Sequence, residues 1–182
     1  MAAPAKWQQS YDAGYLDGKG QWAGGSEISH WAAHKGKLYA ANGDWLDARW
    51  VIPPDGQKQS AQVLRLDQAD GRWQVDLDLG EANDLGLQYM KGNILKPVTF
   101  KRDKQGRPLK TPVQLLIMAA GANFERGGAV SCWVRNDDNG KWNHPLVRHG
   151  SNSCGVRWGP PGLPVFRDQV TGVERRFLLL CN

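Results

Sequence analysis

The sequence predicts an all-β protein made of repeated four-stranded antiparallel units, and three observations carry this prediction. Short apolar segments alternate with turns rich in Gly, Asp and Asn, which is typical of strands and hairpins. Two strand–turn–strand patterns recur along the chain. A helical period of useful length is absent, although residues 85–95 are ambiguous.

The first repeated pattern is a hairpin that leads into a tryptophan. Residues 64–73 and 133–142 each run from an apolar strand through a polar turn to Gly, a basic residue and Trp. Gly, Asn and Asp tolerate the positive φ that tight turns require. We therefore expect a hairpin in both segments, with Trp73 and Trp142 at equivalent positions, packed between neighbouring units.

The second repeated pattern begins with Phe and ends with Gly. It spans residues 100–106 and 166–172, and an apolar strand follows the turn in both cases. Combined with the first pattern, it gives four strands per unit. The predicted organisation is a lead-in at 1–25 and units at about 26–80, 85–150 and 153–182.

These units resemble the blades of Kelch-type propellers. The similar segments are residues 37–43, 62–67 and 71–73 in one blade, and 117–121, 131–134 and 140–142 in the next. The similarity departs from Kelch where a glycine doublet is expected, since Ala-Asn-Gly and Ala-Ala-Gly stand there instead. It covers residues 26–182 and implies a partial β-propeller of about two and a half antiparallel blades.

An open ring of this size implies one of two completions. Propellers contain about 4–8 blades, and an open ring exposes unpaired strand edges. Either the chain is a piece of a longer protein, or copies of it close the ring as a homo-oligomer.

Residues 1–5 lack the basic start and apolar stretch of a signal peptide. The localisation is therefore unknown, and export with the signal peptide already removed is a hypothesis.

Composition argues against several functional classes. The net charge of +5, from 23 basic and 18 acidic residues, is too small and too evenly spread to predict nucleic-acid binding. No apolar run approaches the roughly 20 residues that span a bilayer, so no membrane partner is predicted. Cys132, Cys154 and Cys181 lack zinc or redox spacing, and we predict neither a cofactor nor a metal. The basic stretch at 101–108 is interpreted as a solvated hairpin, with an anionic ligand as the alternative.

Tryptophans beside charged residues mark the first candidate site. The predicted ligand-binding residues are Trp22, Trp45, Asp47, Arg49 and Trp50. Flat aromatic faces beside carboxylate and guanidinium groups suit sugar rings, and Trp and Arg are also enriched in protein–protein hot spots. The first hypothesis is therefore a non-catalytic module that binds a glycan or a protein partner through loops. The alternative is that these tryptophans only anchor their loops.

Acid–base residues in the first unit support a second hypothesis, an enzyme. Glu27, His30 and Asp44 are candidates for the acid/base group of a glycoside hydrolase or lyase, whose chemistry needs carboxyl groups about 5–10 Å apart. His30 and His34 would lie about 13 Å apart on a strand, which argues against a metal site. A third hypothesis is a fragment whose site forms only with the missing blades. Propellers host binding and catalysis alike, so the fold does not decide between these hypotheses.

Overall fold

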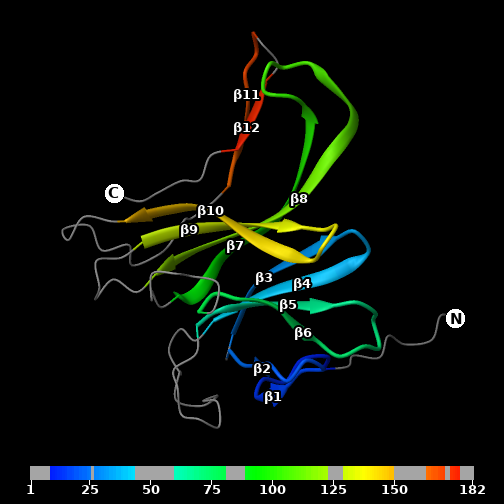
Figure 1. Cartoon of the computed structure of the whole chain (residues 1–182), viewed down its shortest axis with the longest axis vertical. Helices are drawn as coiled ribbons and strands as arrows, with labels where there is room; N and C mark the ends of the chain where they lie inside the picture. Colours follow the sequence, from blue (N-terminus) through cyan, green and yellow to red (C-terminus); the bar gives the residue numbers. More distant parts are fainter. Residues whose placement is uncertain are drawn as a thin grey trace, which may run out of the picture.

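The computed structural model describes residues 9–25, 27–43, 60–80, 89–122, 129–149, 163–170 and 173–176 (Figure 1). These ranges contain strands and turns and no helix, which confirms the predicted all-β class. Within them, no helix has the length and apolar character needed to cross a membrane. The strands are β1 (Tyr15–Leu16), β2 (Trp22–Ala23), β3 (Glu27–His34), β4 (Lys37–Gly43), β5 (Gln62–Leu66), β6 (Gln74–Asp78), β7 (Tyr89–Arg102), β8 (Pro108–Ala122), β9 (Ala129–Asn136), β10 (Lys141–His149), β11 (Val165–Arg167) and β12 (Glu174–Arg176).

Strands β3 to β10 form two consecutive four-stranded antiparallel meanders. In the first, β3 pairs with β4, β4 with β5, and β5 with β6. In the second, β7 pairs with β8, β8 with β9, and β9 with β10. The first meander lies within the unit predicted at 26–80 and the second within the unit predicted at 85–150. The prediction of repeated four-stranded antiparallel units is therefore confirmed.

The two meanders belong to one nearly closed sheet (Figure 1). Its strand order is β10-β9-β8-β7-β4-β5-β6, with β3 attached to β4. The junction is the pair formed by Gly43 of β4 and Lys91 of β7. Close by, the Ser29 hydroxyl of β3 donates to the Gly92 carbonyl of β7 at 2.6 Å. Two four-stranded units that are joined by the pairing of β4 with β7 are consistent with a partial propeller-like fold.

The core between the meanders follows from side-chain alternation, because neighbouring residues of a strand point to opposite sides. On β4, Tyr39 and Ala41 face a core shared with the second meander, whereas Leu38 and Ala40 face away from it. Large buried members of the shared core are Tyr39, Val63, Leu77, Leu79, Tyr89, Leu95, Leu116, Met118 and Trp133. Each such side chain contributes roughly 1.5–3 kcal/mol on burial, so this core holds the meanders face to face.

The lead-in covers the opposite face of the first meander. Tyr15 and Ala23 belong to the same apolar cluster as Trp73, and the Tyr15 hydroxyl donates to the Trp73 carbonyl at 2.8 Å. The buried Asp17 carboxylate accepts the Val75 backbone N–H at 3.0 Å. Trp73 therefore packs against the lead-in and not against the second meander, which corrects its expected position between the two units.

The β11–β12 hairpin lies within the third predicted unit. In Figure 1 it stands beside the end of the long β7–β8 hairpin, which extends beyond the rest of the sheet. Leu163, just before β11, packs with Ile94, Val98 and Ile117 on the outer face of the second meander. Cys132 lies at the edge of this cluster as a free thiol, and burial raises its pKa to about 11.

Candidate functional site

A β-bulge in β6 positions the central carboxylate of the candidate site. Val63 pairs with Leu77 and Leu64 pairs with Val75, so Asp76 is the extra residue on β6. Bulges redirect side chains and are common next to functional sites. Here the Asp76 side chain reaches partners on both meanders, and only 1% of it is exposed.

Asp76 is held by three donors. Arg65 Nη1 on β5, Arg135 Nε on β9 at 2.8 Å and Trp142 Nε1 on β10 at 2.8 Å all donate to its carboxylate. The Arg135 side chain is itself only 6% exposed. Buried charges persist in proteins when they are paired and hydrogen-bonded, and both conditions hold here. Asp76 therefore links the first meander to the second.

Asp137, in the turn between β9 and β10, extends this contact. Its carboxylate accepts Arg135 Nη1 at 2.7 Å and His34 Nε2 at 2.9 Å, and Lys35 Nζ lies 3.0 Å away. Burial on its own would raise the pKa of Asp137, but hydrogen bonds from His34, Lys35 and Arg135 lower that pKa to about 2. We call the side chains of Arg65, Asp76, Arg135, Asp137 and His34 the Asp76 network.

The Asp76 network has the properties of a structural link between the meanders. The Arg135 guanidinium lies 5.4 Å from the centroid of the Tyr39 ring, and burial raises the pKa of Tyr39 to about 12. Acid–base catalysts work best with a pKa near the operating pH, whereas Asp137 and Tyr39 each keep one ionisation state around neutrality. We therefore assign these groups to holding and orienting the strands around them.

A shallow groove opens beside the Asp76 network, where β10 approaches β6. Its volume is about 360 Å³, which lies within the range of small-molecule sites. The lining residues come from the lead-in, from β6 and from the start of β10: Gln21, Asp76, Leu77, Asp78, Gly140, Lys141 and Trp142. We call this the Trp142 groove.

Hydrogen bonds fix the Trp142 indole and the Asp78 carboxylate in the Trp142 groove. The Trp142 indole N–H donates to Asp76, and the rest of this half-buried side chain packs on the shared core. Asp78 accepts Gln62 Nε2 at 2.9 Å and the Gly80 N–H at 2.8 Å. Lys141 is exposed. An immobile aromatic surface beside a carboxylate, an amide and an ammonium group suits a sugar ring, which offers an apolar C–H face and hydroxyls for hydrogen bonds.

The predicted ligand-binding residues are mostly outside the described residues. This holds for Trp45, Asp47, Arg49 and Trp50, so their role stays a prediction. Trp22 lies half-buried on β2, and its carbonyl accepts Gln62 Nε2 at 2.8 Å. Its chain neighbour Gln21 lines the Trp142 groove, which places Trp22 next to that groove in the sequence.

The alternative catalytic residues are partly described. Glu27 and His30 both lie on β3, whereas Asp44 lies outside the described residues. Glu27 Oε2 is 3.9 Å from Lys91 Nζ on β7. Burial lowers the pKa of His30, and the nearby Lys91 charge lowers it further against a backbone hydrogen bond with Asn93. Glu27 and His30 thus share Lys91 as a neighbour at the junction of the meanders.

The two histidines of β3 have separate surroundings. His34 belongs to the Asp76 network, whereas His30 lies near Lys91. Among the described residues, no group of three or more His, Cys, Asp or Glu side chains is arranged to hold a metal ion.

Comparison with known proteins found no similar protein. No family model, no curated protein and no solved structure matches this chain. The resemblance to Kelch-type blades therefore stays a prediction, and the functional argument depends on the geometry of the chain itself.

The sequence contained a signal for the Asp76 network that residue patterns alone did not resolve. In the two aligned hairpins, Arg135 stands where the first repeat has Leu66, which puts a charge in a strand position that is otherwise apolar. Asp76 stands between Val75 and Leu77 in β6, at a position where regular alternation places a polar residue. Only Arg135 is therefore marked by its position in the sequence, and its contact with Asp76 depends on a bulge that the sequence does not reveal.

Proposed function

We propose that this chain is a non-catalytic, Kelch-like partial propeller module that binds a carbohydrate in the Trp142 groove. The observation that carries the proposal is that Trp142, Asp78, Gln21 and Lys141 line one cavity and can offer it an indole, a carboxylate, an amide and an ammonium group. These are the groups that stack on a pyranose ring and hydrogen-bond its hydroxyls.

The rigid position of the Trp142 indole supports a role in ligand binding in addition to its role in packing. Asp76 holds the indole through its N–H, and Arg65 and Arg135 hold Asp76 in turn. A site whose groups are already ordered loses less entropy when a ligand binds, and this raises affinity without new contacts. The loop residues Trp45 and Trp50, predicted from the sequence, would add to the same module as a second contact.

Binding to oligosaccharides tests the proposal directly. We would titrate the chain calorimetrically with neutral cello-, xylo-, manno- and chito-oligosaccharides and then repeat the best case with Gln21→Ala and Lys141→Ala. Each variant removes about one hydrogen bond and should weaken binding roughly 3–10-fold. The exposed Lys110 on β8 lies outside the groove lining, so Lys110→Ala is the matched control and should bind normally.

Two results would reject the carbohydrate site. One is the failure of every neutral oligosaccharide to bind, which would favour a protein partner as the ligand. The other is binding that survives both groove variants unchanged. Far-UV circular dichroism should show the same strand content for all variants, because Gln21 is half-buried and the two lysines are exposed.

A second candidate function is a glycoside hydrolase or lyase that uses Glu27 and His30. The observation in its favour is that both residues lie near Lys91 at the junction of the two meanders, where His30 has a lowered pKa. A neutral imidazole and a carboxylate are both usable acid–base groups. Turnover of a polysaccharide that disappears in Glu27→Gln would support this function, and turnover that persists in that variant would exclude it.

A further inference from the structure

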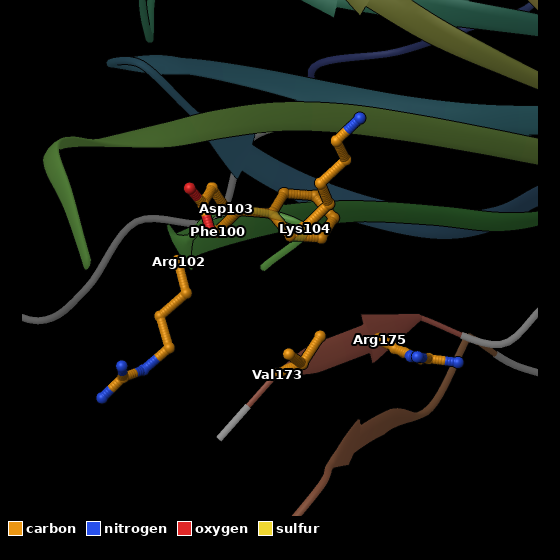
Figure 2. A pocket seen from close by; sticks show the side chains of 6 residues that line it. All are labelled: Phe100, Arg102, Asp103, Lys104, Val173 and Arg175. Carbon is orange, nitrogen blue, oxygen red and sulfur yellow. The ribbon is translucent and has the colours of Figure 1, made fainter. Parts of the chain in front are cut away.

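A second groove lies far from the Trp142 groove, between the turn of the β7–β8 hairpin and strand β12. Figure 2 shows its side chains, which come from two hairpins that are distant in the sequence. Its volume is about 390 Å³. The lining residues are Phe100, Arg102, Asp103, Lys104, Val173 and Arg175. We call this the basic groove.

The basic groove carries an excess of positive charge. Arg102, Lys104 and Arg175 line it, and the one carboxylate of the lining, Asp103, is engaged by its own turn. Asp103 accepts Arg107 Nε at 2.7 Å and the backbone N–H groups of Gln105 and Arg107, both at 2.9 Å. Its charge is therefore matched by Arg107, and the three lining cations remain to set the local potential.

The directions of these cations indicate the shape of the ligand. Figure 2 shows the side chains of Arg102, Lys104 and Arg175 extending to different sides of the groove. A single compact anion such as phosphate would have to draw all three side chains to one point. An extended chain with repeated negative charges can contact all three, because it presents one anionic group to each cation in turn.

The apolar lining indicates the chemistry between those charges. Phe100 and Val173 supply the uncharged surface of the basic groove. Sugar rings pack their C–H faces on such surfaces. Single-stranded nucleic acid, the other common polyanion, is held by stacking successive bases on several aromatic side chains, whereas this groove has one aromatic ring.

We propose that the basic groove binds an acidic polysaccharide, a chain of sugars that carry carboxylate or sulfate groups. This site is separate from the Trp142 groove in position and in ligand chemistry, and it stands whether or not a neutral glycan binds there. The net charge of +5 adds a weaker, long-range attraction for the same ligand.

The test uses two anionic probes, an oligogalacturonide and a heparin-derived oligosaccharide. Their affinity for the full chain would be measured by fluorescence anisotropy at low and at high salt, beside a cello-oligosaccharide of equal length and a single-stranded DNA of equal charge. Both anionic sugars should bind, and salt should weaken the binding steeply because ion pairs are screened. Any binding of the neutral sugar belongs to the Trp142 groove and should not respond to salt.

Charge-matched variants separate the basic groove from general attraction. Lys104→Gln combined with Arg175→Gln removes two exposed lining cations and should weaken anionic binding about tenfold or more. Lys96→Gln combined with Lys110→Gln removes the same charge from exposed positions outside the lining and should leave the affinity within about twofold.

Several outcomes would overturn the proposal. Equal losses in the two double variants would show attraction by net charge alone. Tighter binding of the DNA would assign the groove to nucleic acid. Salt-independent binding would also contradict it. Lys141→Ala, in the Trp142 groove, should leave anionic binding unchanged, so failure at one groove can be told from failure at the other.

Discussion

Two Asp–Arg pairs in this molecule have nearly the same geometry and opposite surroundings. Asp76 Oδ2 lies 2.8 Å from Arg135 Nε, and Asp103 Oδ2 lies 2.7 Å from Arg107 Nε. The first pair is 1% and 6% exposed, whereas the second is 23% and 74% exposed. Distance is therefore not what distinguishes them. The buried pair joins β6 to β9, and the exposed pair closes a single turn.

The difference shows that burial determines how much stability is lost when one partner of an ion pair is removed. Exposed pairs are screened by water and contribute about 0–1 kcal/mol at most. In a buried pair, loss of one partner leaves an uncompensated charge away from water, which is far more costly than the pair itself is stabilising. A second pair of sites, two glycines of the lead-in, allows a similar comparison between a crowded and an open position.

The largest expected effect comes from removing the buried carboxylate. Asp76→Ala leaves Arg135 buried without this partner and also releases the Trp142 N–H. The free energy of unfolding should fall by about 3–5 kcal/mol, measured by urea denaturation. Asp103→Ala is the exposed control and should lower the urea midpoint far less, because the donors that it releases in the turn are open to water. Equal midpoints for the two variants would contradict the distinction drawn between the pairs.

Acid should weaken the contacts of Asp137, because protonation removes the charge that its three donors stabilise. The pKa of Asp137 is about 2 in the folded protein, below its ordinary value, because His34, Lys35 and Arg135 stabilise the carboxylate. A lowered folded pKa means that this stabilisation is complete above about pH 4 and is lost as the pH falls toward 2. The loss should amount to about 2 kcal/mol, visible as a falling melting temperature.

The matched variant for this prediction is Asp137→Asn. It keeps the shape of the side chain and removes the titrating group, so the variant should be less stable at pH 6 and should lose less stability between pH 4 and pH 2. If Asp137→Asn loses as much stability between pH 4 and pH 2 as the wild type does, the acid sensitivity comes from other carboxylates.

Gly25 and Gly20 allow a comparison of a crowded and an open backbone position. Gly25 and Gly20 both have positive φ, +85° and +78°, but a Cβ on Gly25 would lie 2.7 Å from the Asn42 side chain, whereas a Cβ on Gly20 meets nothing within 4 Å. Both alanine variants suffer backbone strain. Gly25→Ala adds steric overlap and should cost about 1–2 kcal/mol more than Gly20→Ala in urea denaturation. Equal costs would mean that the lead-in shifts freely away from Asn42.

The smallest effect is expected at the exposed pair. Arg107→Gln breaks the contact with Asp103 but leaves that carboxylate hydrogen-bonded to backbone N–H groups and accessible to water. The melting temperature should not change measurably, because water and salt already screen this pair. A clear drop would show that the β7–β8 turn depends on the side-chain contact, and it would weaken the contrast with Asp76.

Much of the fold could be predicted from local patterns. The Asp/Asn–Gly turns and the repeated hairpins predicted the four-stranded units, because turn chemistry and alternation act over a few residues. The role of Trp73 could not be predicted in the same way. Its repeat partner Trp142 packs on the shared core, but Trp73 faces the lead-in, and this depends on a contact with Tyr15 that is distant in the sequence.

The candidate site was harder to predict than the fold. Glu27, His30 and Asp44 were chosen from the sequence as one acid–base group; Glu27 and His30 lie near Lys91, Asp44 lies outside the described residues, and the choice stays a prediction. The Trp142 groove was missed because Gln21, Asp78 and Lys141 come from three different elements. Residues that meet only through tertiary packing leave no local pattern, and the bulge at Asp76 adds a register change that residue types do not encode.

Binding of a sugar in the Trp142 groove can be observed directly by nuclear magnetic resonance. We would titrate the ¹⁵N-labelled chain with the neutral oligosaccharides, follow the indole N–H signals and assign Trp142 with the Trp142→Phe variant. We expect the Trp142 indole and the backbone amides of Gln21, Gly140 and Lys141 to shift together, with one dissociation constant. Shifts confined to other tryptophans, with Trp142 unmoved at saturation, would contradict it.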